Sequence, residues 1–190
     1  IESVDELGSL SSEEVGEGDE NVEVLGATIG ASEDSDIQLT AVKISLENTD
    51  GAAAEEDFDK FADSVSVMFG DEEIASVDVD DMNEDNDVWS KTITLDSSAI
   101  ILADEDEDLT IAVTALDNLD SADIDGDNWV ITIEEVRYKD QTGQVFTDST
   151  TGDLPSVSTD FSFDTFAGAN DVEMSLSVSD DSPESSTLNV

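Results

Sequence analysis

Apolar and polar residues alternate along most of this chain with the two-residue period of a β-strand. The clearest run is residues 129–133, in which every second residue is Trp or Ile. After the pair Glu134 and Glu135, the apolar phase moves to Val136 and Tyr138. A β-bulge at the glutamate pair would return both apolar sets to the same face. The pattern therefore predicts one long, bulged strand that faces a core.

Turn residues separate this strand from the next one. Residues 140–143, Asp-Gln-Thr-Gly, predict a hairpin turn that leads into a strand at 144–147. Only residues 52–61 look helical, and they predict a short turn that covers one end of the core. Similar alternating runs predict the remaining strands, at residues 22–29, 37–46, 64–69, 74–79, 88–95, 109–116, 161–163 and 172–178.

Short strands at this spacing predict an all-β, Ig-like antiparallel β-sandwich with at most one short helical turn. Two apolar faces must bury one another, because a single sheet would leave one of them in water. Trp89 and Trp129 would also suit sugar stacking in a lectin-like module, but they fall at inward positions and are assigned to the core. The predicted core consists of Ile37, Leu39, Val42, Ile44, Val65, Val67, Val77, Trp89, Ile93, Leu95, Ile111, Val113, Trp129, Ile131 and Ile133.

The pattern divides the chain into three parts. Residues 1–21 are acidic and rich in Ser and Gly, and we expect either a flexible arm or an edge strand docked on a neighbour. Residues 22–165 are predicted to form the sandwich. Residues 166–190 are predicted to be a separate strand segment, beyond a connector rich in Ser, Thr and Asp. The chain begins with Ile rather than Met, which fits a processed or excerpted segment.

The charge balance narrows the range of partners. Five Lys and Arg face 51 Asp and Glu among 190 residues, so the formal net charge is −46. A surface so poor in cations excludes nucleic acid and anionic membranes as partners. Strong self-repulsion implies neutralisation by high salt or by divalent cations. No apolar run approaches the roughly 20 residues that span a bilayer, so no membrane insertion is expected.

One acidic loop has the spacing of a calcium site. Asp123, Asp125, Asp127 and Glu134 occupy positions 1, 3, 5 and 12 of a Ca²⁺ loop. Asn128 stands where such loops have Gly, although Asn tolerates the left-handed backbone. Strands rather than helices are predicted on both sides of the loop. Glu134 could therefore lie along a strand, too far from the other ligands to reach the ion. The sequence thus predicts a Ca²⁺ site, against the alternative of a solvated acidic loop.

Catalytic chemistry has little support in the sequence. The chain has no Cys and no His, which excludes disulfides, thiolate chemistry and zinc fingers. The acidic runs at 80–87 and 104–108 are dense in carboxylates but lack a usable spacing, and we interpret them as solvated charge at strand ends. Nothing distinguishes one carboxylate pair as that of a glycosidase. We therefore expect no enzyme.

The strand at residues 172–178 stands apart from the predicted sandwich. Val172, Met174, Leu176 and Val178 alternate with polar residues, and a linker containing Pro183 follows. An isolated strand must pair with a sheet. It could close its own domain, begin a further domain, or add to an open edge of a neighbouring copy as an assembly strand.

Three stretches resemble Ig-like β-sandwich repeat domains of prokaryotic surface proteins, including proteins of the S-layer and filament type. They are residues 37–46, residues 62–75 and residues 108–115, and the segment 134–143 fits the late hairpin of such domains. The resemblance extends over roughly residues 22–147. It implies a passive extracellular building block that Ca²⁺ often supports, and it brings no catalytic residues. This chain is more acidic than is usual there.

These observations lead to one main hypothesis and two alternatives. The main one is a non-enzymatic structural subunit of a cell-surface layer or extracellular filament, which pairs with copies of itself through β-strands and binds Ca²⁺. The first alternative is an adhesin or carbohydrate-binding module of a larger secreted protein. The second is a halophile's soluble domain whose acidity is an adaptation to salt.

Overall fold

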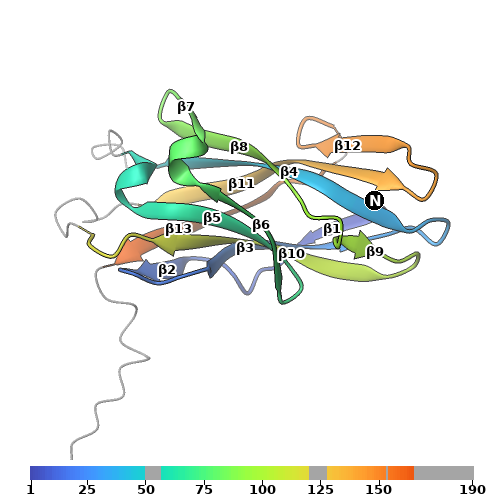
Figure 1. Ribbon diagram of the computed structural model, residues 1–190, viewed down its shortest axis with the longest axis horizontal. Coiled ribbons are helices and arrows are strands. Elements are labelled where there is room, and N and C mark those ends of the chain that lie inside the picture. Colours follow the sequence, from blue (N-terminus) through green and yellow to red (C-terminus); the bar gives the residue numbers. More distant parts are fainter. Residues whose placement is uncertain (50–56, 120–127, 153, 165–190) are drawn as a thin grey trace, which may run out of the picture.

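A computed structural model describes residues 1–49, 57–119, 128–152 and 154–164. These residues form two β-sheets that pack face to face (Figure 1). The prediction of an all-β, Ig-like sandwich is confirmed. The described residues contain no α-helix and only two single 3₁₀ turns, η1 (Phe58–Lys60), inside the predicted helix-like window, and η2 (Val79–Asp81), which the pattern did not predict. None of their helices is long and apolar enough to cross a membrane.

Sheet A has five antiparallel strands in the order β1-β3-β10-β5-β6. Its central strand β10 pairs with β3 on one side and with β5 on the other, and β5 and β6 form a hairpin around Gly70. Gly70 has a φ of +56°, in the left-handed region that favours glycine. The strands are β1 (Ser3–Glu6), β3 (Val22–Gly30), β5 (Ala62–Phe69), β6 (Glu72–Asp78) and β10 (Asp106–Ala115).

Sheet B has eight strands, of which six follow the order β2-β13-β11-β4-β8-β7. The strand β12 pairs with β11, and β9 pairs with β4. The pair of β2 and β13 is parallel, whereas we expected only antiparallel pairs. The strands are β2 (Glu13–Gly16), β4 (Ile37–Asn48), β7 (Asn83–Asp85), β8 (Val88–Thr94), β9 (Ile100–Ile101), β11 (Trp129–Asp140), β12 (Val145–Ser149) and β13 (Val157–Asp164).

The first residues of the chain belong to the sandwich. β1 pairs with β3 in sheet A, residues 7–12 then cross to the other layer, and β2 pairs with β13 in sheet B. The amide of Leu7 donates to the carbonyl of Gly26 at 2.8 Å, and the amide of Ser12 donates to the carbonyl of Asp160 at 3.0 Å. Val15 is fully buried. The flexible arm was therefore the wrong alternative, because backbone pairing at two sheet edges and the burial of Val15 hold this segment in place.

The core lies between the two sheets. Every residue predicted for it is buried except Val77, which is half-buried because β6 is the edge strand of sheet A. Both tryptophans are core residues, as predicted. At one end, the ring of Phe58 packs 4.9 Å from that of Trp129, centroid to centroid, so η1 covers this end of the core. Residues 52–56 of the helix-like window lie outside the described residues.

The predicted bulge in β11 is confirmed. Its register against β4 shifts between Ile133 and Glu135, and apolar residues on both sides of the shift are buried. The predicted hairpin follows, because β11 pairs with β12. The carboxylate of Asp140 accepts hydrogen bonds from the amides of Thr142 and Gln144 at 2.8 and 2.9 Å. The hydroxyl of Thr142 also donates to this carboxylate, at 2.6 Å. That hydrogen bond, together with those from the backbone amides, lowers the pKa of Asp140.

Candidate functional site

The outer face of sheet B is the candidate site, and the strand register defines it. Residues directly opposite one another in a sheet point to the same side. Between β4 and β11, Lys43 is opposite Glu135, Ser45 is opposite Thr132, and Gln38 is opposite Lys139. These positions alternate with the buried ones, so they project away from the core. The neighbouring strands extend each of these pairs into a row across the sheet.

The middle row is neutral and carries hydroxyl groups. Thr132 is opposite Ser45 on one side and Ser158 on the other, and Ser45 is opposite Ser90. The hydroxyl oxygens of Thr132 and Ser158 are 2.9 Å apart. In a chain with a net charge of −46, a row of neutral residues is a local departure from the rest of the surface.

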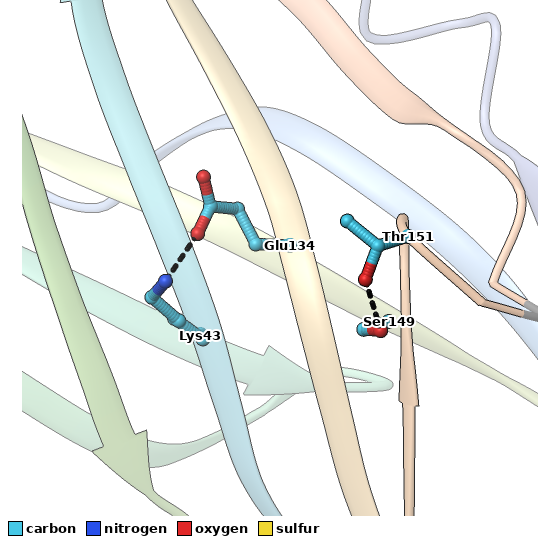
Figure 2. Close-up of polar contacts among 4 residues, drawn as sticks. All are labelled: Lys43, Glu134, Ser149 and Thr151. Carbon is cyan, nitrogen blue, oxygen red and sulfur yellow. Dashed lines mark hydrogen bonds and ion pairs between the residues drawn. The ribbon is translucent and has the colours of Figure 1, made fainter.

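The next row holds an ion pair. Figure 2 shows the side chain of Lys43, from β4, reaching Glu134 on β11, with Nζ and Oε2 2.5 Å apart. Each side chain is about one-third exposed, and the hydrogen bond to Glu134 raises the pKa of Lys43. Nearby, the hydroxyl oxygens of Ser149 and Thr151 lie 3.2 Å apart (Figure 2). The bulge gives this row two glutamates, one of which neutralises Lys43.

The row nearest the β11–β12 hairpin mixes a cation with exposed apolar side chains. Its residues, in order across four strands, are Val145, Lys139, Gln38 and Ile100. Val145 is 57% exposed and Ile100 is 46% exposed, whereas large apolar residues elsewhere in the described part are mostly buried. Arg137, also exposed, lies two residues before Lys139 on the same strand. This corner of the face therefore offers positive charge beside apolar surface.

A hollow of about 420 Å³ opens at the same corner. The side chains of Gln38, Ile100 and Lys139 line it together with the hairpin residues 140–143. Lys139 supplies hydrogen-bond donors and Ile100 supplies apolar contact. Gln38 Nε2 donates to the carbonyl of Ser97 at 3.0 Å and keeps its second N–H for a ligand. The carboxylates of Asp36 and Asp140 lie at the same hollow. The arrangement can hold a polar group that accepts hydrogen bonds.

The outer face of sheet A has a different character. None of the residues in its strands is Lys or Arg. Thr28 is opposite both Asp5 and Asp108, and its hydroxyl donates to the carboxylate of Asp108 at 2.6 Å. The hydroxyl of Thr110 donates to Glu23 at 3.1 Å on the same face. The strand register places these carboxylates on that face: Asp5, Glu23, Glu73, Asp78, Asp106 and Asp108.

The cations are therefore unevenly distributed over the molecule. Of the five in the chain, Lys43, Arg137 and Lys139 lie on the outer face of sheet B. Lys91 donates to the backbone carbonyl of Asp81, and Lys60 approaches Asp57 at 3.9 Å. We call the surface formed by Lys43, Arg137, Lys139, Gln38, Ile100 and Val145 the cationic face.

Only one of the four predicted calcium ligands is among the described residues. Glu134 lies within β11 and pairs with Lys43, while Asp123, Asp125 and Asp127 lie outside the described residues. Within the described ranges, no cluster of three or more acidic side chains is placed to hold a metal ion. The Ca²⁺ site accordingly stays a prediction. The assembly strand at Val172, Met174, Leu176 and Val178 also lies outside the described residues.

Sequence reasoning missed the cationic face, although one signal was present. Arg137 and Lys139 are two of only five cations, and they occupy alternate positions of one strand. That spacing places both on the outer side of the strand. Their juxtaposition with Ile100 and Val145 depends on strand pairing, which the local pattern does not define.

Comparisons with known proteins complete the description. No family model matches the chain, and no curated protein matches it. Among solved structures, it is similar to the cohesin module of a family 33 glycoside hydrolase from Clostridium perfringens, with 13% identity and a TM-score of 0.38 over 85% of this chain and 95% of that one. It is also similar to the collagen-binding subdomain of the Enterococcus faecalis surface protein ACE, with 8% identity and a TM-score of 0.28 over 80% and 96% of the two chains.

Proposed function

We propose that this chain is a non-enzymatic structural subunit of an extracellular or cell-surface assembly, joined to copies of itself. The observation that carries the proposal is the cationic face. Exposed apolar side chains beside unpaired positive charge are typical of surfaces that meet another protein. Three of the five cations of the chain lie here, so like charge opposes a second copy less at this face than at the outer face of sheet A, whose strands contain no Lys or Arg.

Two finer parts of the proposal rest on the sequence. The first is β-strand pairing between copies through residues 172–178, whose alternation of apolar and polar residues supports an edge-adding strand. The second is Ca²⁺ at Asp123, Asp125, Asp127 and Glu134, whose spacing supports binding and whose charge the ion would neutralise. The resemblance of residues 37–46 to repeat domains of surface proteins supports the extracellular location.

A second candidate function is an adhesin or carbohydrate-binding module within a larger secreted protein. The hollow beside Gln38, Ile100 and Lys139 favours it, because a small polar ligand such as a sugar would find donors and apolar contact there. In that case the protein would act as a monomer. Glycan-array binding by the monomer, abolished by Gln38→Ala, would favour this function over self-assembly.

Assembly can be tested by measuring the mass of the particles in solution and imaging them. We expect purified protein to form regular polymers in the electron microscope when NaCl or Ca²⁺ is added, and to be monomeric in dilute buffer. Deleting residues 166–190 tests strand pairing on its own. The truncated chain should stay folded by circular dichroism but no longer form polymers. A wild-type protein that stays monomeric under all these conditions contradicts the proposed function.

A further inference from the structure

We infer that the cationic face of one copy docks on the acidic outer face of sheet A in a second copy. This inference rests on the proposed function and specifies the contact that it requires. The two surfaces lie on opposite sides of the same sandwich, since one is the outer face of sheet B and the other is the outer face of sheet A (Figure 1).

On the cationic side of the contact, Arg137 and Lys139 form no ion pair among the described residues, and Lys139 shares its hollow with Asp36 and Asp140. Lys43 is neutralised by Glu134, but Arg137 is exposed and Lys139 lines the hollow beside the hairpin. Ile100 and Val145 flank Lys139 in the same row, so a docked partner would bury apolar surface next to the charge. Removing water from around the charges strengthens the Coulomb attraction between them, against the cost of desolvating both groups.

The acidic side of the contact lies on a face without cations of its own. Asp108 is held by the hydroxyl of Thr28, and Glu73 accepts a hydrogen bond from Asn21 at 3.3 Å. These hydrogen bonds orient the carboxylates and leave acceptor capacity on each of them. Asp108 and Glu73 are therefore oriented carboxylates that an Arg and a Lys from another copy can meet.

The occupant is a second copy because each molecule carries both halves of the match. The five strands of sheet A are between 4 and 10 residues long, so their face covers about 600 Å². A protein interface at the small end of the standard range buries about that area on each partner. Opposite faces of one molecule cannot meet across a two-fold axis, so the contact is heterologous and repeats in one direction. Copies joined in this way form an open filament.

Salt should control this contact in a characteristic way. At low ionic strength the net charge of −46 repels an approaching copy over a long distance. At physiological ionic strength the screening length falls to about 8 Å, which removes the long-range repulsion and leaves the contacting pairs largely intact. We expect association to strengthen at least tenfold between dilute buffer and moderate NaCl.

The test uses two variants of the full chain, each with one altered face. The double substitution Arg137→Glu with Lys139→Glu reverses the cationic face, and Glu73→Lys with Asp108→Lys reverses part of the acidic face. The matched control for the cationic-face variant is Lys60→Glu with Lys91→Glu, which makes the net charge more negative by the same amount away from both faces. Sedimentation velocity in moderate NaCl reports the size of the assembly.

Each altered face alone should weaken association at least tenfold, while the control should leave it within about twofold of wild type. An equimolar mixture of the two face variants should again form growing assemblies, since their intact faces pair with each other and their two reversed faces are again opposite in charge. Thermal melts confirm that each variant is folded. If the charge reversal fails to fold, Arg137→Gln with Lys139→Gln tests the same face with a smaller perturbation.

Several outcomes would overturn the inference, and they separate it from the proposed function. If the reversed cationic face polymerises as wild type does and only the deletion of 166–190 prevents assembly, the copies join by strand pairing alone. A closed dimer instead of a growing series would show a two-fold contact. A last outcome would overturn the proposed function too. In it, the wild-type protein does not self-associate but binds a different acidic protein or polysaccharide, and reversing the cationic face abolishes that binding.

Discussion

The two sheets of this sandwich are built alike on the inside and differently on the outside. Both bury a period-two row of apolar side chains, and both inner faces meet in one core. Outside, the strands of sheet A carry carboxylates and no Lys or Arg, whereas sheet B carries a row of hydroxyls and the cationic face, with Glu134 and Glu135 beside Lys43. The inward pattern thus determines the fold, and the outward residues of the same strands distinguish one face from the other.

The largest effect on stability is expected from a substitution in the core between the two sheets. Trp129→Ala removes the ring that packs against Phe58 and Phe61, and should lower the free energy of unfolding by about 3–5 kcal/mol. Val130→Ala, at the adjacent outward position, should cost at most about 0.5 kcal/mol. Urea denaturation measures both. A loss below about 1 kcal/mol for Trp129→Ala would contradict the packing described.

A second effect concerns the segment that crosses from sheet A to sheet B. A Cβ at Gly26 would lie 2.7 Å from Leu7 Cδ1 and 2.9 Å from Thr110 Cγ2. Gly26→Val should therefore displace the crossing and cost about 1–3 kcal/mol by overpacking. Gly8→Ala is the control, since its Cβ would meet nothing within 4 Å. Faster hydrogen exchange at the amide of Leu7 in the Gly26 variant alone would confirm the displacement.

The third effect tests whether the acidity is generic or includes a calcium site. Stability should rise with NaCl because screening relieves repulsion. If the predicted loop binds Ca²⁺, a concentration ten times the Kd should add about 1.4 kcal/mol beyond an ionic-strength-matched dose of NaCl. Asp125→Ala with Asp127→Ala should remove that excess. If Ca²⁺ and matched NaCl raise the melting temperature equally, the acidic loop has no specific calcium site and acts only through its charge.

The smallest effect concerns the ion pair on the outer face of sheet B. Lys43 and Glu134 are about one-third exposed, so their coupling should be only about 0.2–1 kcal/mol after solvent screening. A double-mutant cycle with Lys43→Met and Glu134→Gln measures it by urea denaturation. A coupling that does not weaken in high salt would show that the pair is shielded from solvent more than its exposure indicates.

Much of the fold follows from local pattern, because burial on one side of a strand imposes a period of two. The bulge at Glu134 and Glu135 was predictable for the same reason, since a phase change must be absorbed if both apolar sets are buried. Val77 was not, because its exposure depends on β6 lying at an edge. The cationic face was not predictable as a whole either: Arg137 and Lys139 share a strand, but Ile100 and Val145 join them only through pairing with residues distant in sequence.

The parallel pairing of β2 with β13 has a mechanical consequence. In this register Glu13 is opposite Phe161 and Gly16 is opposite Asp164, so both strands run the same way. Tension applied before β2 and after β13 would slide the strands along each other. It would load all the hydrogen bonds between them at once, whereas peeling breaks them one at a time. Single-molecule pulling across these two strands should meet a high rupture force, lowered by Val15→Pro, which removes a backbone donor. This resistance lies along the strands, at right angles to the direction in which copies would stack through their outer faces.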